Sequence, residues 1–129
     1  MSAITPNPEQ FKALAAAAAD DDGPVVMLNL LKFKSGGGAR EYGKYGDAAS
    51  GMVKALGGRM LYIGRADQVL IGDEAANDWD AIALVEYPSR QAFIDMVSKR
   101  EYRDAHEHRE GGLERTVLIA TVQQQGAQA

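Results

Sequence analysis

Residues 79–122 decide the fold, and they read WDAIALVEYPSRQAFIDMVSKREYRDAHEHREGGLERTVLIATV. Apolar residues that alternate with polar ones predict a strand at each end, and apolar residues three or four apart predict helices between them. A serine able to cap a helix precedes each helical pattern, and a double glycine ends the second one. The expected elements are a strand over Trp79–Tyr87, a helix capped by Ser89, a helix from Ser98 to Gly111, and a strand over Arg115–Val122.

The second of these helices carries most of the polar residues that are candidates for a site. Ser98 and Glu101 have the spacing of a capping box at its start. Four residues then share one face at helical spacing, while His108 lies about 120° away from the first of them, given the ~100° step per residue. The four residues of that stripe are Tyr102, Ala105, His106 and Arg109.

The residues before this stretch supply two more strands and two more helices. Val25–Phe33 is apolar almost throughout, which predicts a central strand that is buried on both faces. Asn29 shares a face of that strand with Met27 and Leu31, because side chains alternate along a strand. The other expected elements are a helix over residues 5–22 with an Asn7–Gln10 capping box, a helix over about Arg40–Leu56, and a strand over Arg59–Arg65 that Val69–Gly72 continues or pairs with.

This order of elements predicts an α+β fold of the ferredoxin-like β-α-β-β-α-β type, with a four-stranded antiparallel sheet and helices on one face. We assign residues 24–122 to this domain, residues 1–23 to an extra N-terminal helical extension on its outside, and residues 123–129 to a frayed tail. The first and third strands carry apolar residues on both faces, although the helices cover only one. A second subunit is therefore expected to cover the other face, giving a homodimer.

Composition excludes several classes of function. The chain has 129 residues, a net charge of −4 and no cysteine, which rules out disulfides, thiolate metal sites and cysteine nucleophiles. Basic residues are scattered, so no nucleic-acid partner is expected. No apolar run approaches the roughly 20 residues of a membrane span, and the start lacks the pattern of a signal peptide, so a cytoplasmic protein without a membrane partner is expected.

Four segments of the chain carry a family resemblance. They are PVVMLNLLKF (24–33), GGRMLYIG (57–64), WDAIALVEYPSRQAF (79–93) and EYRDAHEHREGGL (101–113). Together they resemble the family called domain of unknown function 1330, of the dimeric α/β-barrel superfamily, over about residues 24–122. The resemblance implies a ferredoxin-like fold that dimerises through its sheets, and it implies no defined reaction. Relatives in the wider superfamily include isomerases, cofactor-independent monooxygenases and haem proteins, several with a pocket between sheet and helices.

Such a pocket predicts roles for five residues of this chain. His108 and Tyr45 are the candidate catalytic residues, because a histidine near neutral pH is a general acid or base and a phenol stabilises a developing oxyanion. His106 is the alternative base. The candidate substrate-binding residues are Asn29, Tyr102 and Arg109, of which Arg109 is suited to hold a carboxylate bidentately.

Each of these residues also has a purely structural interpretation. Asn29 would bond a neighbouring backbone group, and the tyrosines would be core residues with hydrated hydroxyls. Either histidine would be a surface residue. Arg109 would pair with Glu86 or Asp80. These interpretations stay open at the level of sequence.

No metal or cofactor is expected from the sequence. His106 and His108 are two apart, so on a helix they point about 200° apart and cannot share an ion, whereas helical ligand pairs sit three or four apart. Neither histidine is placed by resemblance to a haem family. The predicted function is a pocket for a small carbonyl or carboxylate compound, with isomerase-like or cofactor-free monooxygenase-like chemistry. The alternative is a non-catalytic ligand-binding or structural dimer.

Overall fold

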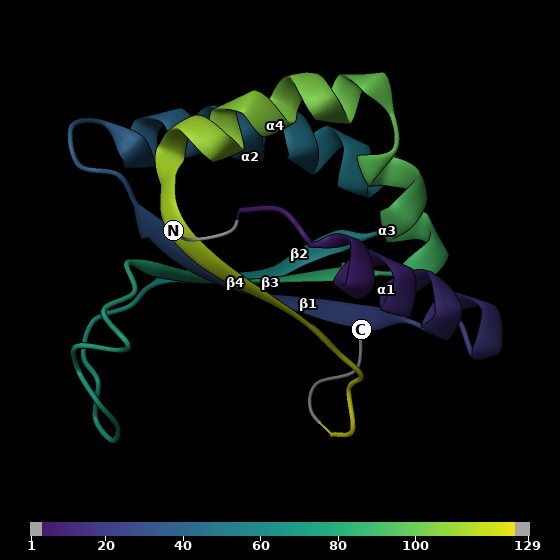
Figure 1. Ribbon diagram of the computed structural model, residues 1–129, viewed down its shortest axis with the longest axis horizontal. Coiled ribbons are helices and arrows are strands. Elements are labelled where there is room, and N and C mark those ends of the chain that lie inside the picture. Colours follow the sequence, from purple (N-terminus) through teal and green to yellow (C-terminus); the bar gives the residue numbers. More distant parts are fainter. Residues whose placement is uncertain (1–3, 126–129) are drawn as a thin grey trace.

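The computed structural model describes residues 4–125 as one antiparallel sheet with helices on one of its faces (Figure 1). The strand order is β2-β3-β1-β4, as the ferredoxin-like prediction requires, and the fold class is confirmed. In chain order the elements are α1 (Pro8–Asp20), β1 (Val25–Phe33), α2 (Gly38–Ala55), β2 (Arg59–Arg65), β3 (Ala81–Tyr87), α3 (Arg90–Val97), α4 (Arg100–Gly112) and β4 (Leu113–Thr121).

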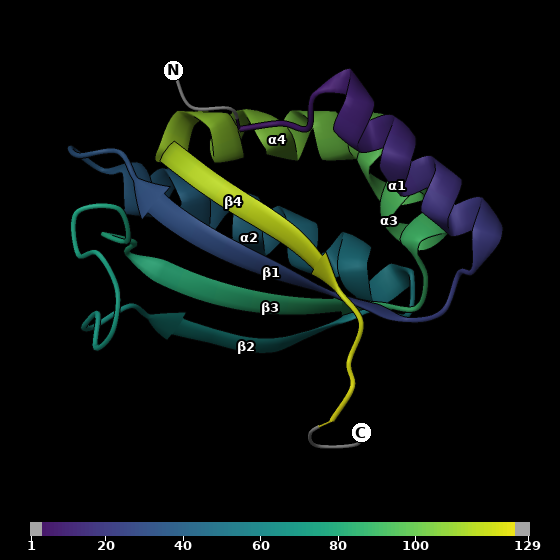
Figure 2. The same ribbon diagram turned by 60° about the horizontal axis from the view of Figure 1, so that its bottom comes forward.

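The apolar first strand lies in the middle of the sheet, as predicted. β1 pairs with β3 on one side and β4 on the other (Figure 2). In this register Asn29 stands opposite Ala83 and Leu118. Met27 belongs to the buried core beneath the helices, so Asn29, two residues along the same strand, faces the helices as well. The alternate residues of the strand, such as Leu28, face the side of the sheet that no helix covers.

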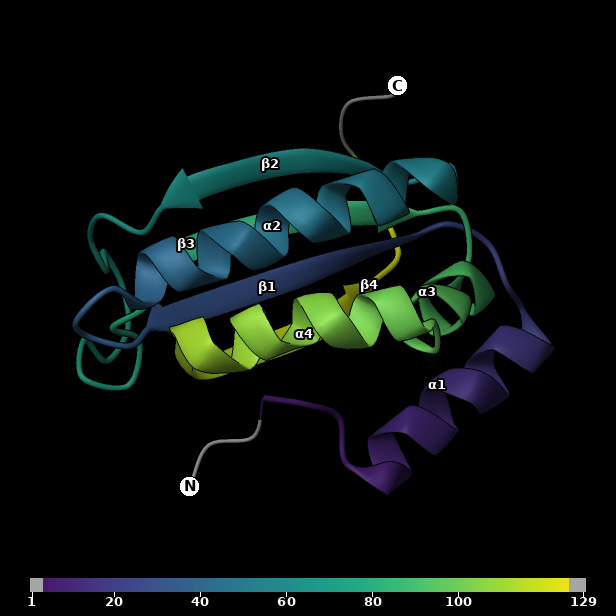
Figure 3. The same cartoon turned by 90° about the horizontal axis from the view of Figure 1, so that it is seen from above.

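The helices α2 and α4 lie side by side over the sheet, and α1 lies outside them against α3 (Figure 3). The core between sheet and helices is formed by Val25, Met27, Val53, Tyr87, Phe93, Met96 and Tyr102. No residue of α1 is fully buried, although Leu14 packs against the edge of this core. The predicted Asn7–Gln10 capping box of α1 is present: the backbone N–H of Gln10 donates to the Asn7 side-chain oxygen at 2.7 Å. No helix among the described residues is long and apolar enough to cross a bilayer.

Close backbone contact joins the start of α2 to the end of α4. A Cβ atom on Gly112 would lie 2.6 Å from the Gly38 carbonyl oxygen and from the Tyr42 amide nitrogen. The Gly112 carbonyl oxygen in turn accepts a hydrogen bond from the Lys34 amide at 2.8 Å. Glycine at position 112 is therefore what allows these two helices to meet.

Two sequence predictions are wrong. Val69–Gly72 forms no strand: Leu70 and Ile71 are 85% and 93% exposed in a loop that projects from the end of the sheet (Figure 1). Two apolar residues cannot continue a strand without a neighbouring strand to pair with, and the Ala66 amide donates instead to the Asp80 carbonyl, which closes the loop. Ser98 does not cap α4. Its hydroxyl donates to the Ile94 carbonyl at 2.7 Å, which terminates α3.

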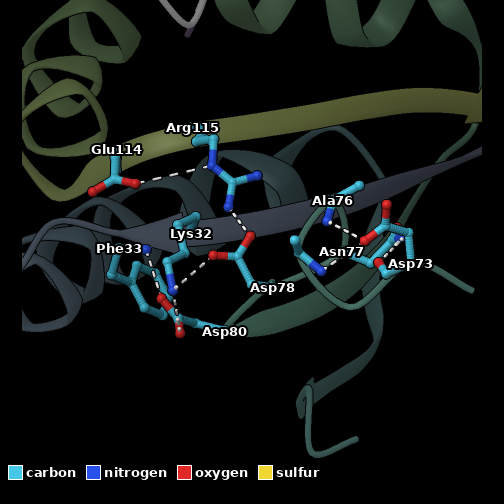
Figure 4. Close-up of polar contacts among 10 residues, drawn as sticks. Lys32, Phe33, Asp73, Ala76, Asn77, Asp78, Asp80, Glu114 and Arg115 are labelled. Carbon is cyan, nitrogen blue, oxygen red and sulfur yellow. Dashed lines mark hydrogen bonds and ion pairs between the residues drawn. The ribbon is translucent and has the colours of Figure 1, made fainter. Parts of the chain in front are cut away.

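Charged residues fasten this loop to the sheet (Figure 4). Asp78 bonds to Arg115 of β4, and Lys32 Nζ of β1 lies 3.5 Å from Asp80 Oδ1. The other oxygen of Asp80 accepts a hydrogen bond from the Phe33 amide at 2.9 Å. The Arg115 guanidinium stacks 4.7 Å from the Trp79 ring centre. Residues 78–80 are thus held in place while the loop tip stays exposed.

Candidate functional site

A cavity of about 870 Å³ lies between the sheet and the helices. Side chains of β1, β3 and β4 line it from the sheet, and α2 and α4 line it from the opposite side. The sheet contributes mostly apolar residues, and the helices contribute most of the polar ones. Four of the five predicted site residues, together with one that was only an alternative, lie in its wall: Asn29, Tyr45, Tyr102, Arg109 and His106.

Arg109 is the buried charge of this cavity. Its side chain is on the inner face of α4, and the residue is only 5% exposed. Nη1 donates to the Ile4 carbonyl oxygen at 2.6 Å, and the guanidinium carbon lies 5.9 Å from the Tyr45 ring centre. Within residues 4–125, no carboxylate forms an ion pair with it.

The ion pairs proposed for Arg109 as a structural residue are absent from the described part of the chain. Glu86 is bound by Arg59, whose Nε lies 2.8 Å from Oε1. Asp80 is occupied by Lys32 and by the Phe33 amide, at the end of the sheet. Both carboxylates therefore have other partners, and among residues 4–125 only the Ile4 carbonyl accepts from Arg109, so N–H donors remain beside the cavity.

Two tyrosine hydroxyls form a pair in the cavity wall. The hydroxyls of Tyr45 and Tyr102 are 2.9 Å apart, and the rings meet edge to face. Burial, reinforced by the neighbouring Tyr102, raises the pKa of Tyr45 well above that of free tyrosine. The Tyr45 phenol therefore stays protonated at neutral pH. One O–H is used between the two hydroxyls, and the other has no acceptor within residues 4–125, so it is available to donate to a ligand.

Asn29 contributes an amide to the sheet side of the cavity. Its Nδ2 donates to the carbonyl oxygens of Met27 at 3.3 Å and Ala83 at 3.4 Å, which is the backbone bonding that the structural interpretation expected. Both bonds are long, and they use only the NH₂ group. In the described region, the side-chain oxygen of Asn29 receives no hydrogen bond from protein and remains available as an acceptor.

The two histidines of α4 lie in different environments. His108 does not line the cavity: its Nδ1 lies 2.5 Å from Glu41 Oε2, which joins α4 to α2 on the outer side. The hydrogen bond from His108 lowers the pKa of Glu41. The sequence prediction of His108 as the cavity base therefore finds no support in its position.

His106 takes the place in the cavity wall that was expected for His108. Both ring nitrogens of His106 are buried and have no hydrogen-bond partner among the described residues. Glu110 Oε1 lies 3.5 Å from Nε2, too poorly placed for a hydrogen bond but close enough to interact electrostatically. Burial lowers the pKa of His106, and Glu110 opposes that shift. The shared stripe with Tyr102 and Arg109 was the sequence signal that favoured His106.

The N-terminal segment forms a wall that sequence reasoning missed. Ile4, Thr5 and Pro6 line the cavity ahead of α1, and Phe11 and Leu14 line it from α1 itself. The segment was expected to be an appendage on the outside. The alanine-rich pattern gave no signal that its leading residues reach the Arg109 guanidinium.

The arrangement offers binding groups for a small organic molecule. Among residues 4–125 there is no group of three or more histidine, cysteine or acidic side chains that is able to hold a metal. The polar groups are instead an arginine, two phenols, an amide and an imidazole around an apolar space. Such a set is able to bind an anionic or carbonyl-bearing compound and to exchange a proton with it.

Comparison with solved structures identifies relatives with the same fold. A protein of unknown function from Rhodopseudomonas palustris is 31% identical, covers 98% of this chain and 100% of its own, and superposes with a TM-score of 0.86. A dimeric ferredoxin-like protein of unknown function from Jannaschia is 10% identical, with coverage of 78% and 99% and a TM-score of 0.58. A hydroxynitrile lyase from Passiflora edulis is 10% identical, with coverage of 81% and 98% and a TM-score of 0.61. The last two likenesses are of fold alone.

A search of curated proteins gave no match. The family model described as Domain of unknown function (DUF1330) matches residues 37–122, which is most of the chain and includes every strand but β1. That match agrees with the resemblance carried by the strand, Pro-Ser and helix segments. The 31% identical relative from Rhodopseudomonas palustris extends the likeness over the N-terminal helix as well. The chain belongs to the DUF1330 family.

Proposed function

We propose that the protein binds a small carboxylate-bearing compound in the cavity and that Arg109 holds its carboxylate. The observation that carries the proposal is the buried guanidinium without an acidic partner in the described residues. A buried charge is costly unless it is paired and hydrogen-bonded. One of the five N–H donors of Arg109 is satisfied by the Ile4 carbonyl, so the others suit the two oxygens of a carboxylate.

The other cavity residues suit the rest of such a compound. A cavity of about 870 Å³ is within the usual range for small-molecule sites. The free O–H of the Tyr45–Tyr102 pair is suited to donate to a carbonyl oxygen, and the Asn29 oxygen is suited to accept from a hydroxyl or amide. His108 has no place in this proposal, because it faces Glu41 outside the cavity.

We also propose that the protein is a homodimer joined through the uncovered sheet face. Ile119 is 45% exposed there, opposite Leu28 in the sheet register. The neighbouring residues Leu84 and Ile82 of β3 alternate onto the same face. A sheet face with several large apolar side chains is normally covered by another part of the protein or by a partner. The dimeric ferredoxin-like neighbour from Jannaschia supports covering it with a second copy.

A matched pair of ligands tests the carboxylate site. Wild-type protein is titrated with small aromatic and aliphatic carboxylates and with the corresponding neutral amides, and the melting temperature is followed. A ligand at a hundredfold excess over its dissociation constant stabilises the fold by about 2.7 kcal/mol. We expect carboxylates to raise the melting temperature and their amides to do so much less.

Comparing the variants Arg109→Ala and Arg100→Ala shows whether the rise in melting temperature with carboxylates depends on the cavity arginine. Arg100 is an exposed arginine at the start of the same helix, so its loss changes net charge equally without touching the cavity. The carboxylate shift is expected to disappear in Arg109→Ala and to persist in Arg100→Ala. Equal shifts in the two variants, or equal shifts by acids and amides, would contradict the proposal.

A further inference from the structure

We infer that the cavity also performs chemistry: His106 removes a proton from the carbon next to the carbonyl group of a bound 2-oxo acid. This inference rests on the proposed carboxylate site at Arg109 and adds to it a reaction and a substrate class. It concerns a residue that the binding proposal does not need. It is carried by the position and the unmet hydrogen bonding of the imidazole.

His106 is a partly buried residue whose ring nitrogens have no hydrogen-bond partner in the described chain. Both ring nitrogens are shielded from solvent, and neither forms a hydrogen bond within the described chain. Buried polar atoms in proteins are nearly always bonded, and exceptions call for an explanation such as a catalytic role. The ring lies in the cavity wall beside Tyr102, with ring centres 5.9 Å apart. Both nitrogens are covered in this structure, so a ligand in the cavity would reach one of them after a turn of the ring, and no group of the described protein bonds to either nitrogen.

The surroundings of His106 favour the neutral, basic form. Burial and the nearby Arg109 charge lower its pKa, with Glu110 acting in the opposite direction. A neutral imidazole is able to accept a proton without first losing one. After it has done so, the Glu110 carboxylate 3.5 Å from Nε2 is placed to balance the imidazolium charge. The arrangement suits a base that is charged only during the reaction.

The cavity also holds a donor for the oxygen that becomes negative. When the C–H bond breaks, its electron pair moves toward the carbonyl group, and the carbonyl oxygen becomes an enolate oxygen. The Tyr45–Tyr102 hydroxyl pair has one O–H left to donate to this oxygen. Because burial keeps Tyr45 protonated, the pair acts as a donor and not as a second base.

The placement of these groups points to a 2-oxo acid. Arg109 follows His106 by three residues on α4, so the two side chains project from neighbouring positions on one helix face. A 2-oxo acid presents a carboxylate, a carbonyl group and an acidic C–H on three successive carbons. The carboxylate on Arg109 would thus bring the C–H bond toward His106. The proton returns from His106 to the same carbon, so no oxidant, reductant or metal is consumed.

Deuterium exchange measures this step directly. Wild-type protein is incubated in D₂O with 2-oxobutanoate, and proton NMR follows the loss of the C3 methylene signal. Calorimetric titration with the same compound measures binding separately. We expect exchange well above the buffer rate. His106→Gln is expected to lower the protein-catalysed rate by about 100-fold or more and to leave the dissociation constant little changed, as removal of a general base does.

Two further variants serve as comparisons. Glu107→Gln alters an exposed residue next to His106 and is expected to leave exchange unchanged. His108→Gln separates the two histidines, and a loss of exchange in His108→Gln with retention in His106→Gln would overturn the assignment. His106→Asn, checked by circular dichroism, replaces His106→Gln if that variant does not fold.

The outcomes distinguish this inference from the binding proposal. Binding of 2-oxobutanoate that is lost in Arg109→Ala, with no exchange in the wild type, would overturn the reaction and leave the carboxylate site intact. Failure of the wild type to bind 2-oxobutanoate or any other small carboxylate would overturn both. Exchange that depends on His106 and Arg109 together would support both.

Discussion

His108 and Glu41 form a short contact on the outer side of the two helices that enclose the cavity. Nδ1 of His108 on α4 lies 2.5 Å from Oε2 of Glu41 on α2. Lys44 adds a second interaction to the same carboxylate at 3.4 Å. The contact joins the two helices away from the cavity, so it serves their packing and not the ligand. The contact makes the stability of the folded protein depend on pH in the acid range.

The first prediction concerns this dependence. Hydrogen bonding to His108 lowers the pKa of Glu41 from its usual 4.5, so the folded state favours the carboxylate. That contribution to stability is present above the unfolded pKa and is lost as the pH falls through the lower, folded pKa. The melting temperature of wild type relative to Glu41→Gln is expected to be constant above about pH 5 and to fall below about pH 4.5.

Glu107→Gln is the control for that measurement. Glu107 lies on the same helix as His108 and forms no ion pair in the part of the chain that the structure describes. Its loss should leave the acid profile close to that of the wild type. A Glu41→Gln profile that is parallel to the wild type from pH 3 to 7 would show that the contact contributes nothing to stability.

The second prediction concerns the junction of α2 and α4. A Cβ atom on Gly112 would meet two backbone atoms at 2.6 Å, and backbone atoms cannot move aside cheaply. Gly112→Ala is expected to lower the free energy of unfolding by about 1–3 kcal/mol, as overpacking does. Gly43→Ala is the matched change: Gly43 lies within α2 with no atom near its missing Cβ, so alanine should raise stability by about 0.5–1 kcal/mol. Urea denaturation compares the two variants, and equal effects would contradict the close contact.

The third prediction concerns how the N-terminal extension is fastened. The Asp22 carboxylate accepts hydrogen bonds from the Arg90 amide at 2.6 Å and the Gln91 amide at 3.2 Å, at the start of α3. Asp22→Ala is expected to cost about 1 kcal/mol, the usual effect of losing a helix cap. Asp20→Ala, at the exposed C-terminal end of α1, should be neutral or slightly stabilising, because it removes a negative charge there. Thermal denaturation of both variants checks the difference.

The fold was predictable because its signals are local and periodic. The apolar run of Val25–Phe33 indicated a central strand, and Asn7 and Ser89 cap the helices that they were expected to cap. The prediction that Ser98 caps α4 was wrong because a serine between two helices is able to bond to a carbonyl of the preceding helix as readily as to an amide of the next one. The prediction of a strand at Val69–Gly72 was wrong because a strand needs a neighbouring strand to pair with, and sequence periodicity does not reveal whether one is there.

The site was predictable in part. Helical spacing indicated that Tyr102 and Arg109 share one face of α4, and strand alternation indicated that Asn29 shares a face with Met27. The structure shows that all four residues line the cavity. The choice between His106 and His108 needed the position of α2, since Glu41 is what holds His108 outside. The contact between Ile4 and Arg109 spans almost the whole chain and involves a backbone carbonyl, so no side-chain pattern signals it.

The last prediction concerns the uncovered face of the sheet. Ile119 of the edge strand β4 is exposed on this face, so an aspartate there would be buried without a partner if a second copy covers this face. Ile119→Asp is therefore expected to convert a dimer into a monomer in light scattering at micromolar concentration. Ala48→Asp places the same charge on the exposed face of α2, away from the sheet, and should leave the dimer intact. A wild type that is monomeric under these conditions, or two variants that dissociate equally, would rule out the sheet as the interface.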